Sequence, residues 1–74
     1  MKNYERRRVF RHIRMYMAEE TKGGPRKSFY FGRIEGYLMG IWDLNYIDGK
    51  TWHKLTNLNM DIYMGRTKIY EKQN

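Results

Sequence analysis

The chain of 74 residues contains no cysteine and carries a net charge of +7, which describes one small basic domain. The absence of thiols excludes disulfide bonds and thiolate metal sites, and so short a chain has no room for an enclosed substrate cavity beside a core. No apolar run approaches the roughly 20 residues that a membrane-spanning helix needs. We therefore expect a cytoplasmic protein that uses no cofactor or metal and does not insert into a membrane.

The positive charge is confined to the first part of the chain. Residues 1–33 contain ten Lys and Arg against three Glu, a balance of +7, whereas residues 34–74 contain five basic and five acidic side chains. Like charges three or four residues apart destabilise a helix by a few tenths of a kcal/mol each. A short chain that carries such a cluster is therefore expected to place it against an anionic partner.

Residues 3–21 are predicted to form a helix, in which Asn3 can cap the start and Glu5 suits the first turn. At about 100° per residue, the apolar side chains form one stripe, which consists of Val9, Phe10, Ile13, Tyr16 and Met17. The opposite side carries most of the arginines: Arg7, Arg11 and Arg14 on one flank and Arg8 on the other. One face of this helix should be buried, and the other should be cationic.

Residues 22–27 are predicted to be a linker, because Gly-Gly-Pro ends a helix and starts a turn. A second helix is predicted over residues 28–46, with Ser28 as its cap. Glycines recur every four residues on one side of it, at Gly32, Gly36 and Gly40, and each costs a helix about 1 kcal/mol relative to Ala. We expect them to let another helix of the domain approach closely. A homodimer contact and a bulged strand are the alternatives.

A third helix is predicted over residues 48–64. Asp48 stands at the N-cap position, and Ile47 before it and Trp52 after it fit a hydrophobic staple. The alternative is a β-hairpin near residues 44–54, because Asp-Gly is also a strong hairpin turn.

The chain is therefore predicted to be mostly α, a small three-helix domain in one unit, with the tail 66–74 as a short extension or a disordered end. Gly65 is expected to end the third helix. The predicted core consists of Val9, Phe10, Ile13, Tyr16, Met17, Ile34, Leu38, Ile41, Trp42, Trp52, Leu55, Leu58 and Ile62.

Arginine is suited to phosphate and carboxylate, since its planar guanidinium forms two parallel hydrogen bonds with either group. The predicted binding residues are the helical arginines and the basic side chains that follow them: Arg7, Arg8, Arg11, Arg14, Lys22, Arg26, Lys27 and Arg33. The alternative interpretation is a solvated face that only keeps the protein soluble. Arg6 projects toward the apolar side and is expected to cover the edge of the core.

These residues favour a non-enzymatic module that binds the backbone of DNA or RNA through its first helix. The alternative is a small inhibitor or adaptor that docks on an acidic face of a larger protein, as a phage or mobile-element protein does when it blocks a host nuclease such as a CRISPR effector. A homodimer is also possible. Catalysis is not expected, because the two histidines, His12 and His53, belong to different segments.

Two weaker patterns remain open. The second and third helices are compatible with a helix-turn-helix, in which the later helix would present Lys50, His53, Lys54, Asn57 and Asp61 to a DNA groove. Met15, Met39, Met60 and Met64 project away from the apolar stripes. They indicate either a protein-binding surface or an error in the assignment of the helix faces.

Overall fold

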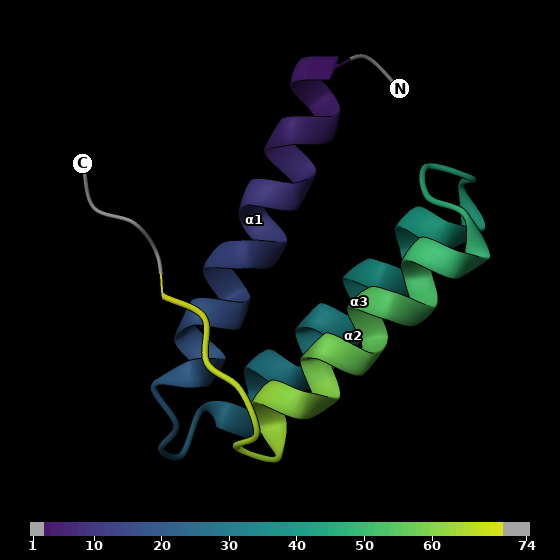
Figure 1. Ribbon diagram of the computed structural model, residues 1–74. Helices are drawn as coiled ribbons and strands as arrows, with labels where there is room; N and C mark the ends of the chain where they lie inside the picture. The colour runs from purple at the N-terminus through teal and green to yellow at the C-terminus, as the bar shows by residue number, and fades with distance from the viewer. Residues whose placement is uncertain (1–2, 71–74) are drawn as a thin grey trace.

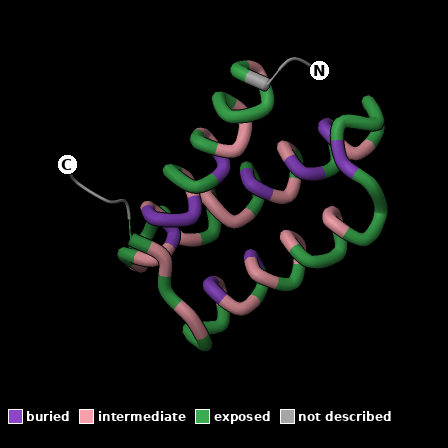
Figure 2. The backbone as a smooth tube through the Cα atoms, turned by 45° about the horizontal axis from the view of Figure 1, so that its top comes forward, coloured by how far each residue is buried: buried purple, intermediate pink, exposed green. Residues whose placement is uncertain are grey.

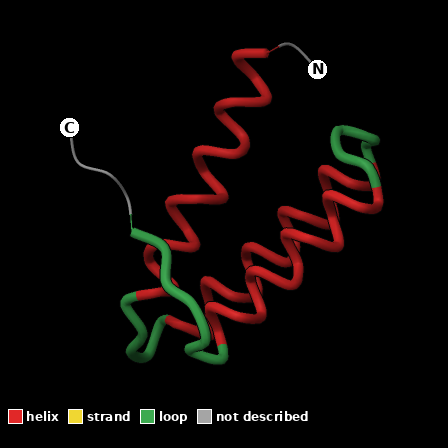
Figure 3. The backbone as a smooth tube through the Cα atoms, in the orientation of Figure 1, coloured by secondary structure: helices red, strands yellow, loops and turns green. Residues whose placement is uncertain are grey.

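The computed structural model describes residues 3–70, and in this range it contains three α-helices and no strand (Figures 1 and 3). Helix α1 spans Asn3–Thr21, α2 spans Lys27–Asp43 and α3 spans Gly49–Tyr63. The predicted three-helix domain is therefore confirmed, and the alternative of a β-hairpin near residues 44–54 is wrong. The last part of the predicted tail, residues 71–74, lies outside the described residues.

The start of α3 explains why the hairpin does not form. The Thr51 amide donates a hydrogen bond of 2.7 Å to Oδ1 of Asp48, whose extended backbone (φ −82°, ψ 170°) is that of an N-cap residue. This bond and a hydrogen bond from the Thr51 side chain lower the pKa of the Asp48 carboxyl below its usual range. Asp48 and Gly49 therefore begin a helix instead of closing a two-residue turn.

Helix α2 differs from its predicted bounds at both ends. It starts at Lys27 rather than residue 28, Arg26 makes no side-chain cap, and the Ser28 hydroxyl lies 3.2 Å from the Tyr63 hydroxyl instead. It ends at Asp43 rather than residue 46, because Asn45 adopts a left-handed conformation with φ of 60°. The Tyr46 amide then donates to the carbonyl of Ile41 over 2.8 Å, which closes the helix with a Schellman motif.

Glycines end the other two helices, as the sequence predicted. After α1, the Gly23 amide donates to the Glu20 carbonyl over 3.0 Å, and both Gly23 and Gly24 have positive φ. After α3, Gly65 has φ of 76°, and the next amide donates to the carbonyl of Asp61 over 2.8 Å. Positive φ costs glycine almost nothing, so these are natural places for the chain to leave a helix.

Helices α2 and α3 lie side by side and antiparallel, and α1 packs across the end of this hairpin that is nearer the 22–26 linker (Figures 1 and 3). Toward its N-terminus α1 diverges from the hairpin. Burial follows the same division, because the buried residues of α1 all fall between Ile13 and Glu20 and none of residues 4–12 is buried (Figure 2). In the range described, no helix is long and apolar enough to cross a bilayer.

The core is aliphatic and lies where the three helices meet. Its buried members are Ile13, Met17, Ile34, Leu38, Ile41, Ile47 and Ile62. The other predicted core residues pack against this cluster while remaining partly exposed, and the two tryptophans among them stack with ring centroids 4.3 Å apart. Tyr37, Ile47 and Ile69 also join the core, although the predicted core did not include them.

Two polar side chains are fully buried among these apolar ones. Glu20 of α1 and Asn59 of α3 are each 0% exposed. Asn59 donates to the Phe31 carbonyl over 3.2 Å, whereas neither carboxylate oxygen of Glu20 has a hydrogen-bond partner among residues 3–70. Burial raises the pKa of Glu20 to about 7, an effect that Lys27 opposes and Glu35 reinforces. Burial also raises the pKa of Glu35 on α2, against the hydrogen bond from Asn59.

The expected close packing at the glycines of α2 is wrong. Gly32, Gly36 and Gly40 are exposed, and a Cβ atom added at any of them would meet nothing within 4 Å. The helix presents this side to solvent, while Ile34, Leu38 and Ile41 on its other side enter the core. The four methionines assigned away from the apolar stripes are also exposed, so the assignment of the helix faces was correct there.

Candidate nucleic-acid interface

The outward face of α1 carries an arginine ridge, which we define as Arg7, Arg8, Arg11 and Arg14. All four side chains are exposed. The ion pairs formed within residues 3–70 are Lys22 with Glu19 and Arg66 with Asp61, so no described carboxylate neutralises a ridge arginine. Four guanidinium groups therefore remain available to a partner.

Helix geometry arranges this face in two rows. Residues seven apart differ by only about 20° around a helix, so Arg7 and Arg14 form one row and Tyr4 and Arg11 form the neighbouring row. Arg7 and Arg14 are separated by about 10 Å along the axis, at 1.5 Å per residue. The row spacing allows several guanidinium groups to contact one extended anionic polymer at once.

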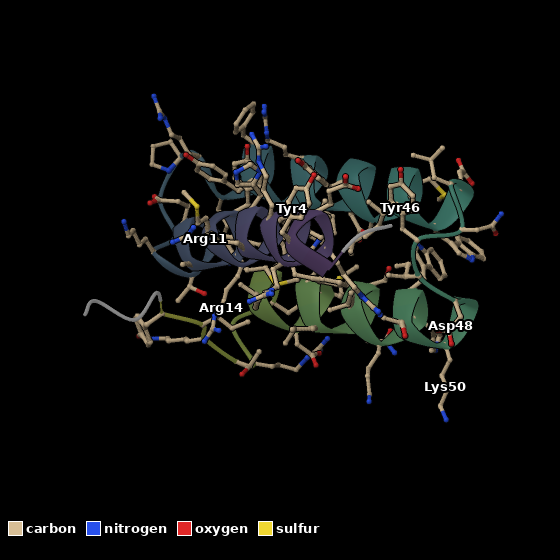
Figure 4. All side chains as sticks on the ribbon, turned by 90° about the horizontal axis from the view of Figure 1, so that it is seen from above. Tyr4, Arg11, Arg14, Tyr46, Asp48 and Lys50 are labelled. Carbon is tan, nitrogen blue, oxygen red and sulfur yellow. The ribbon has the colours of Figure 1, made fainter. Side chains whose placement is uncertain are left out.

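Three of the four ridge arginines, Arg7, Arg8 and Arg11, belong to the half of α1 that leaves the hairpin, whereas Arg14 lies on the exposed side of the docked half. Figure 4 shows Arg11 and Arg14 on the side of α1 away from the loop that carries Tyr46. The long side chains leave an open hollow of about 960 Å³ between them, lined by Tyr4, Arg6, Arg7, Arg8, Phe10, Arg11, His12 and Arg14. A hollow that opens along a helix suits a polymer better than an enclosed small molecule.

Tyr4 is the aromatic residue of this surface. Its ring is 62% exposed, and within the described part of the chain it makes no ring contact and no side-chain hydrogen bond. Arg6 lies on the edge of the ridge, where its guanidinium stands 6.0 Å from the centroid of the Phe10 ring. It covers an apolar side chain, as the sequence predicted.

The remaining predicted binding residues do not join the ridge. Arg33 stands 5.0 Å over the ring of Tyr16, and Tyr16 lies about 180° around α1 from Arg7. Lys27 is half-buried 5.1 Å over the Tyr63 ring. The structure thus places these two cations on aromatic faces elsewhere in the molecule.

Lys22 and Arg26 lie at the linker, beyond the docked end of α1. The Lys22 ammonium forms an ion pair of 2.9 Å with Glu19, and Arg26 is exposed at the start of α2. Of the eight predicted binding residues, the ridge therefore unites the four arginines of α1 and leaves the other four apart.

The helix-turn-helix alternative does not fit the geometry. That motif crosses its two helices at about 90–120°, whereas α2 and α3 lie side by side. Lys50 is at the far end of the molecule from Arg11 and Arg14 (Figure 4). The polar face of α3 is a separate surface and not a continuation of the ridge.

Sequence reasoning missed the segment that follows α3. The Ile69 amide donates a hydrogen bond of 3.0 Å to Oγ1 of Thr21, and the Ile69 side chain packs against the core. Residues 66–70 therefore run beside the C-terminal half of α1 (Figure 1). The one signal in the sequence was a single aliphatic residue, Ile69, in a polar tail.

The described residues form no cluster that could hold a metal ion. No group of three or more His, Cys, Asp and Glu side chains in residues 3–70 is placed to hold a metal ion. The Nδ1 atom of His12 lies 3.5 Å from the Tyr37 hydroxyl, at the limit of a hydrogen bond, while His53 belongs to α3.

No family model matches the chain, and neither a curated protein nor a solved structure matches it significantly. What the ridge does must therefore be inferred from its own geometry.

Proposed function

We propose that this protein is a non-enzymatic module that binds nucleic acid by placing the arginine ridge against the phosphate backbone. The observation that carries the proposal is the set of four exposed arginines on one face of a projecting helix, none of which is paired with a described carboxylate. Guanidinium groups bind phosphate in two parallel hydrogen bonds, and each phosphate contact releases counterions from the nucleic acid.

The arrangement of α1 supports this function in two ways. Three of the four ridge arginines lie on the half that diverges from the hairpin, and Arg14 follows on the exposed side of the docked half, so the ridge is open to a long polymer. The docked half fixes the direction of the helix through buried Ile13 and Met17. The guanidinium groups are therefore carried on a rigid element, which reduces the entropy lost on binding.

A pair of charge-matched variants tests the proposal. R7Q/R11Q removes two charges from the ridge, and K50Q/K54Q removes two charges from exposed positions on α3. The net charge is then the same in both variants, so only the location of the lost charge differs. Binding of a fluorescent oligonucleotide is measured by anisotropy at low salt.

We expect R7Q/R11Q to weaken binding about tenfold or more and K50Q/K54Q to weaken it less than about twofold. Equal losses in the two variants would show a non-specific charge effect and would contradict the proposal. If the parent protein binds no nucleic acid even at low salt, the function is wrong, and a pull-down from a nuclease-treated lysate then tests whether the ridge docks on an acidic protein instead.

A further inference from the structure

The face that carries the arginine ridge continues past the last arginine and is covered there by residues 66–70. The row of Tyr4 and Arg11 reaches Ala18 after seven more residues, and the row of Arg7 and Arg14 reaches Thr21. Ala18 is only 7% exposed although it lies on the outward face. The Ile69 amide bonds to the Thr21 hydroxyl, so residues 66–70 are the element that lies against this part of the face.

The docked segment presents its polar side chains outward. Exposure alternates along it: Arg66, Lys68 and Tyr70 are exposed, whereas Thr67 and Ile69 are half-buried. Successive side chains of an extended chain point in opposite directions, and Ile69 packs against the core. Lys68 and Tyr70 therefore face solvent on the segment that is anchored to α1 at Thr21. Arg66 is paired with Asp61 over 2.9 Å, which leaves Lys68 as the additional cation.

The exposed tyrosine rings are unevenly distributed over the molecule. Tyr16, Tyr30, Tyr37 and Tyr63 each contact another aromatic ring. The other three tyrosines, Tyr4, Tyr46 and Tyr70, are 62%, 39% and 66% exposed and make no ring contact within residues 3–70. Tyr4 lies on the ridge face, and Tyr70 belongs to the segment whose Ile69 amide bonds to Thr21, farther along the row of Arg7 and Arg14. The third lies in the loop between α2 and α3, at the far end of the hairpin (Figure 4).

We infer that the ligand of the ridge is a single-stranded nucleic acid, whose phosphates contact the arginines while its bases stack on Tyr4 at one end and on Tyr70 at the other. This inference rests on the proposed function. Tyr4 and the Thr21 anchor of the C-terminal segment are separated by about 25 Å along α1. A duplex keeps its bases stacked inside, so tyrosines beside its backbone find no base faces. A single strand exposes them, and base stacking on an aromatic side chain does not depend on sequence.

The test compares three tyrosine variants on two ligands. Y4A and Y70A remove the rings beside the ridge, and Y46A removes an exposed ring that lies away from it. Each variant is titrated with fluorescent oligothymidine and with a duplex of the same length, and oligouridine tests whether RNA replaces DNA. Y4F keeps the ring without its hydroxyl. Circular dichroism checks that the exposed substitutions leave the helices intact.

We expect the parent to bind the single strand more tightly than the duplex. Y4A and Y70A should each weaken single-strand binding between about fivefold and 100-fold, with duplex binding unchanged, and Y46A and Y4F should behave like the parent. If Y4A or Y70A keeps parental affinity for the strand, the proposed path between the two rings is wrong while the binding function stands. If the parent binds neither strand nor duplex at low salt, the proposed function itself has failed.

Discussion

The two halves of α1 differ in where they place ionisable side chains, which are exposed arginines in one half and a buried glutamate in the other. The N-terminal half holds three of the four ridge arginines in solvent, and none of them is paired with a described acidic group. The C-terminal half buries Glu20 completely, with no hydrogen-bond partner for its carboxylate oxygens. One continuous helix thus carries solvated charge that is available to a partner and an acid whose burial links folding to pH. The fold depends on one half, and the proposed function depends on the other.

The largest expected effect is a loss of stability, which should be greater for a substitution in the docked half of α1 than for one in the half that leaves the hairpin. Ile13 is 2% exposed in the docked half, whereas Val9, one turn earlier on the same stripe, is only half-buried. Ile13→Ala should destabilise the fold by about 2–5 kcal/mol, because it removes buried methyl groups and leaves a cavity. Val9→Ala should reduce the unfolding free energy clearly less, because the Val9 side chain is already partly exposed to solvent. Urea denaturation measures the unfolding free energy of both variants. Equal losses would contradict the division of α1 into a docked half and a half that leaves the hairpin.

The buried acid should make stability depend on pH. The pKa of Glu20 is raised in the folded state from 4.5 to about 7, mainly by burial, with Lys27 opposing and Glu35 adding to the shift. Between pH 4.5 and about 7, Glu20 is therefore protonated in the folded protein and ionised in the unfolded chain. The resulting stabilisation is complete below pH 4.5, declines as the pH rises toward 7 and is absent above it. Its full size is on the order of 3 kcal/mol.

Glu20→Gln tests this, because the amide is neutral at every pH and nearly the same size. Relative to the parent, E20Q should gain stability as the pH rises through the interval between 4.5 and 7. The other carboxyl groups are common to both proteins, so the difference between the two curves isolates Glu20. Parallel curves of unfolding free energy against pH would show that folding does not raise the pKa of Glu20.

A smaller effect is expected on the open side of α2. Gly36 lies inside the helix, and a Cβ atom at this position would have no neighbour within 4 Å, so Gly36→Ala should stabilise the protein by roughly 1 kcal/mol. Gly65→Ala is the contrasting variant, because φ of 76° strains any residue with a Cβ atom. The midpoint temperature of thermal unfolding should rise in G36A and fall in G65A. A loss of stability in G36A would indicate that this face packs against another surface.

The smallest expected effect is the change in stability when the ridge arginines are replaced. Replacing Arg7, Arg11 and Arg14 with Gln should leave the unfolding free energy unchanged or raise it by a few tenths of a kcal/mol, since like charges on a helix repel. Chemical denaturation of the triple variant checks this. A large destabilisation would show that the arginines support the fold and would weaken their assignment to a partner.

The fold could be predicted where local signals agreed. The limits of α1 followed from a clear helical period and from the glycines after it, and Asp48 marked the start of α3 by its ability to cap. The end of α2 could not be placed, because it depends on a left-handed conformation of Asn45. Asparagine tolerates this conformation but does not require it, so the sequence alone does not predict it. The glycines of α2 suggested close packing, yet spacing alone does not say which side of a helix meets a neighbour.

The candidate site was predicted only in part. Helical spacing united the four ridge arginines, whereas the positions of Lys27 and Arg33 depend on the tertiary contacts of Tyr63 and Tyr16. Glu20 was overlooked although it falls between Val9 and Ile13 on the apolar stripe, because an acidic residue is normally expected outside. The C-terminal segment was missed for a different reason, since its place depends on one bond between Thr21 and Ile69, far apart in sequence.

The salt dependence of binding tests the central claim most directly, since each phosphate contact on a single strand contributes about −0.7 to the slope of log K against log salt. For the parent and its four ridge arginines we expect a slope of about −2.8 on oligothymidine. For R7Q/R11Q/R14Q, which keeps one of them, we expect about −0.7. A triple variant with the parental slope would show that the phosphates are held elsewhere, and the ridge would not be the nucleic-acid interface.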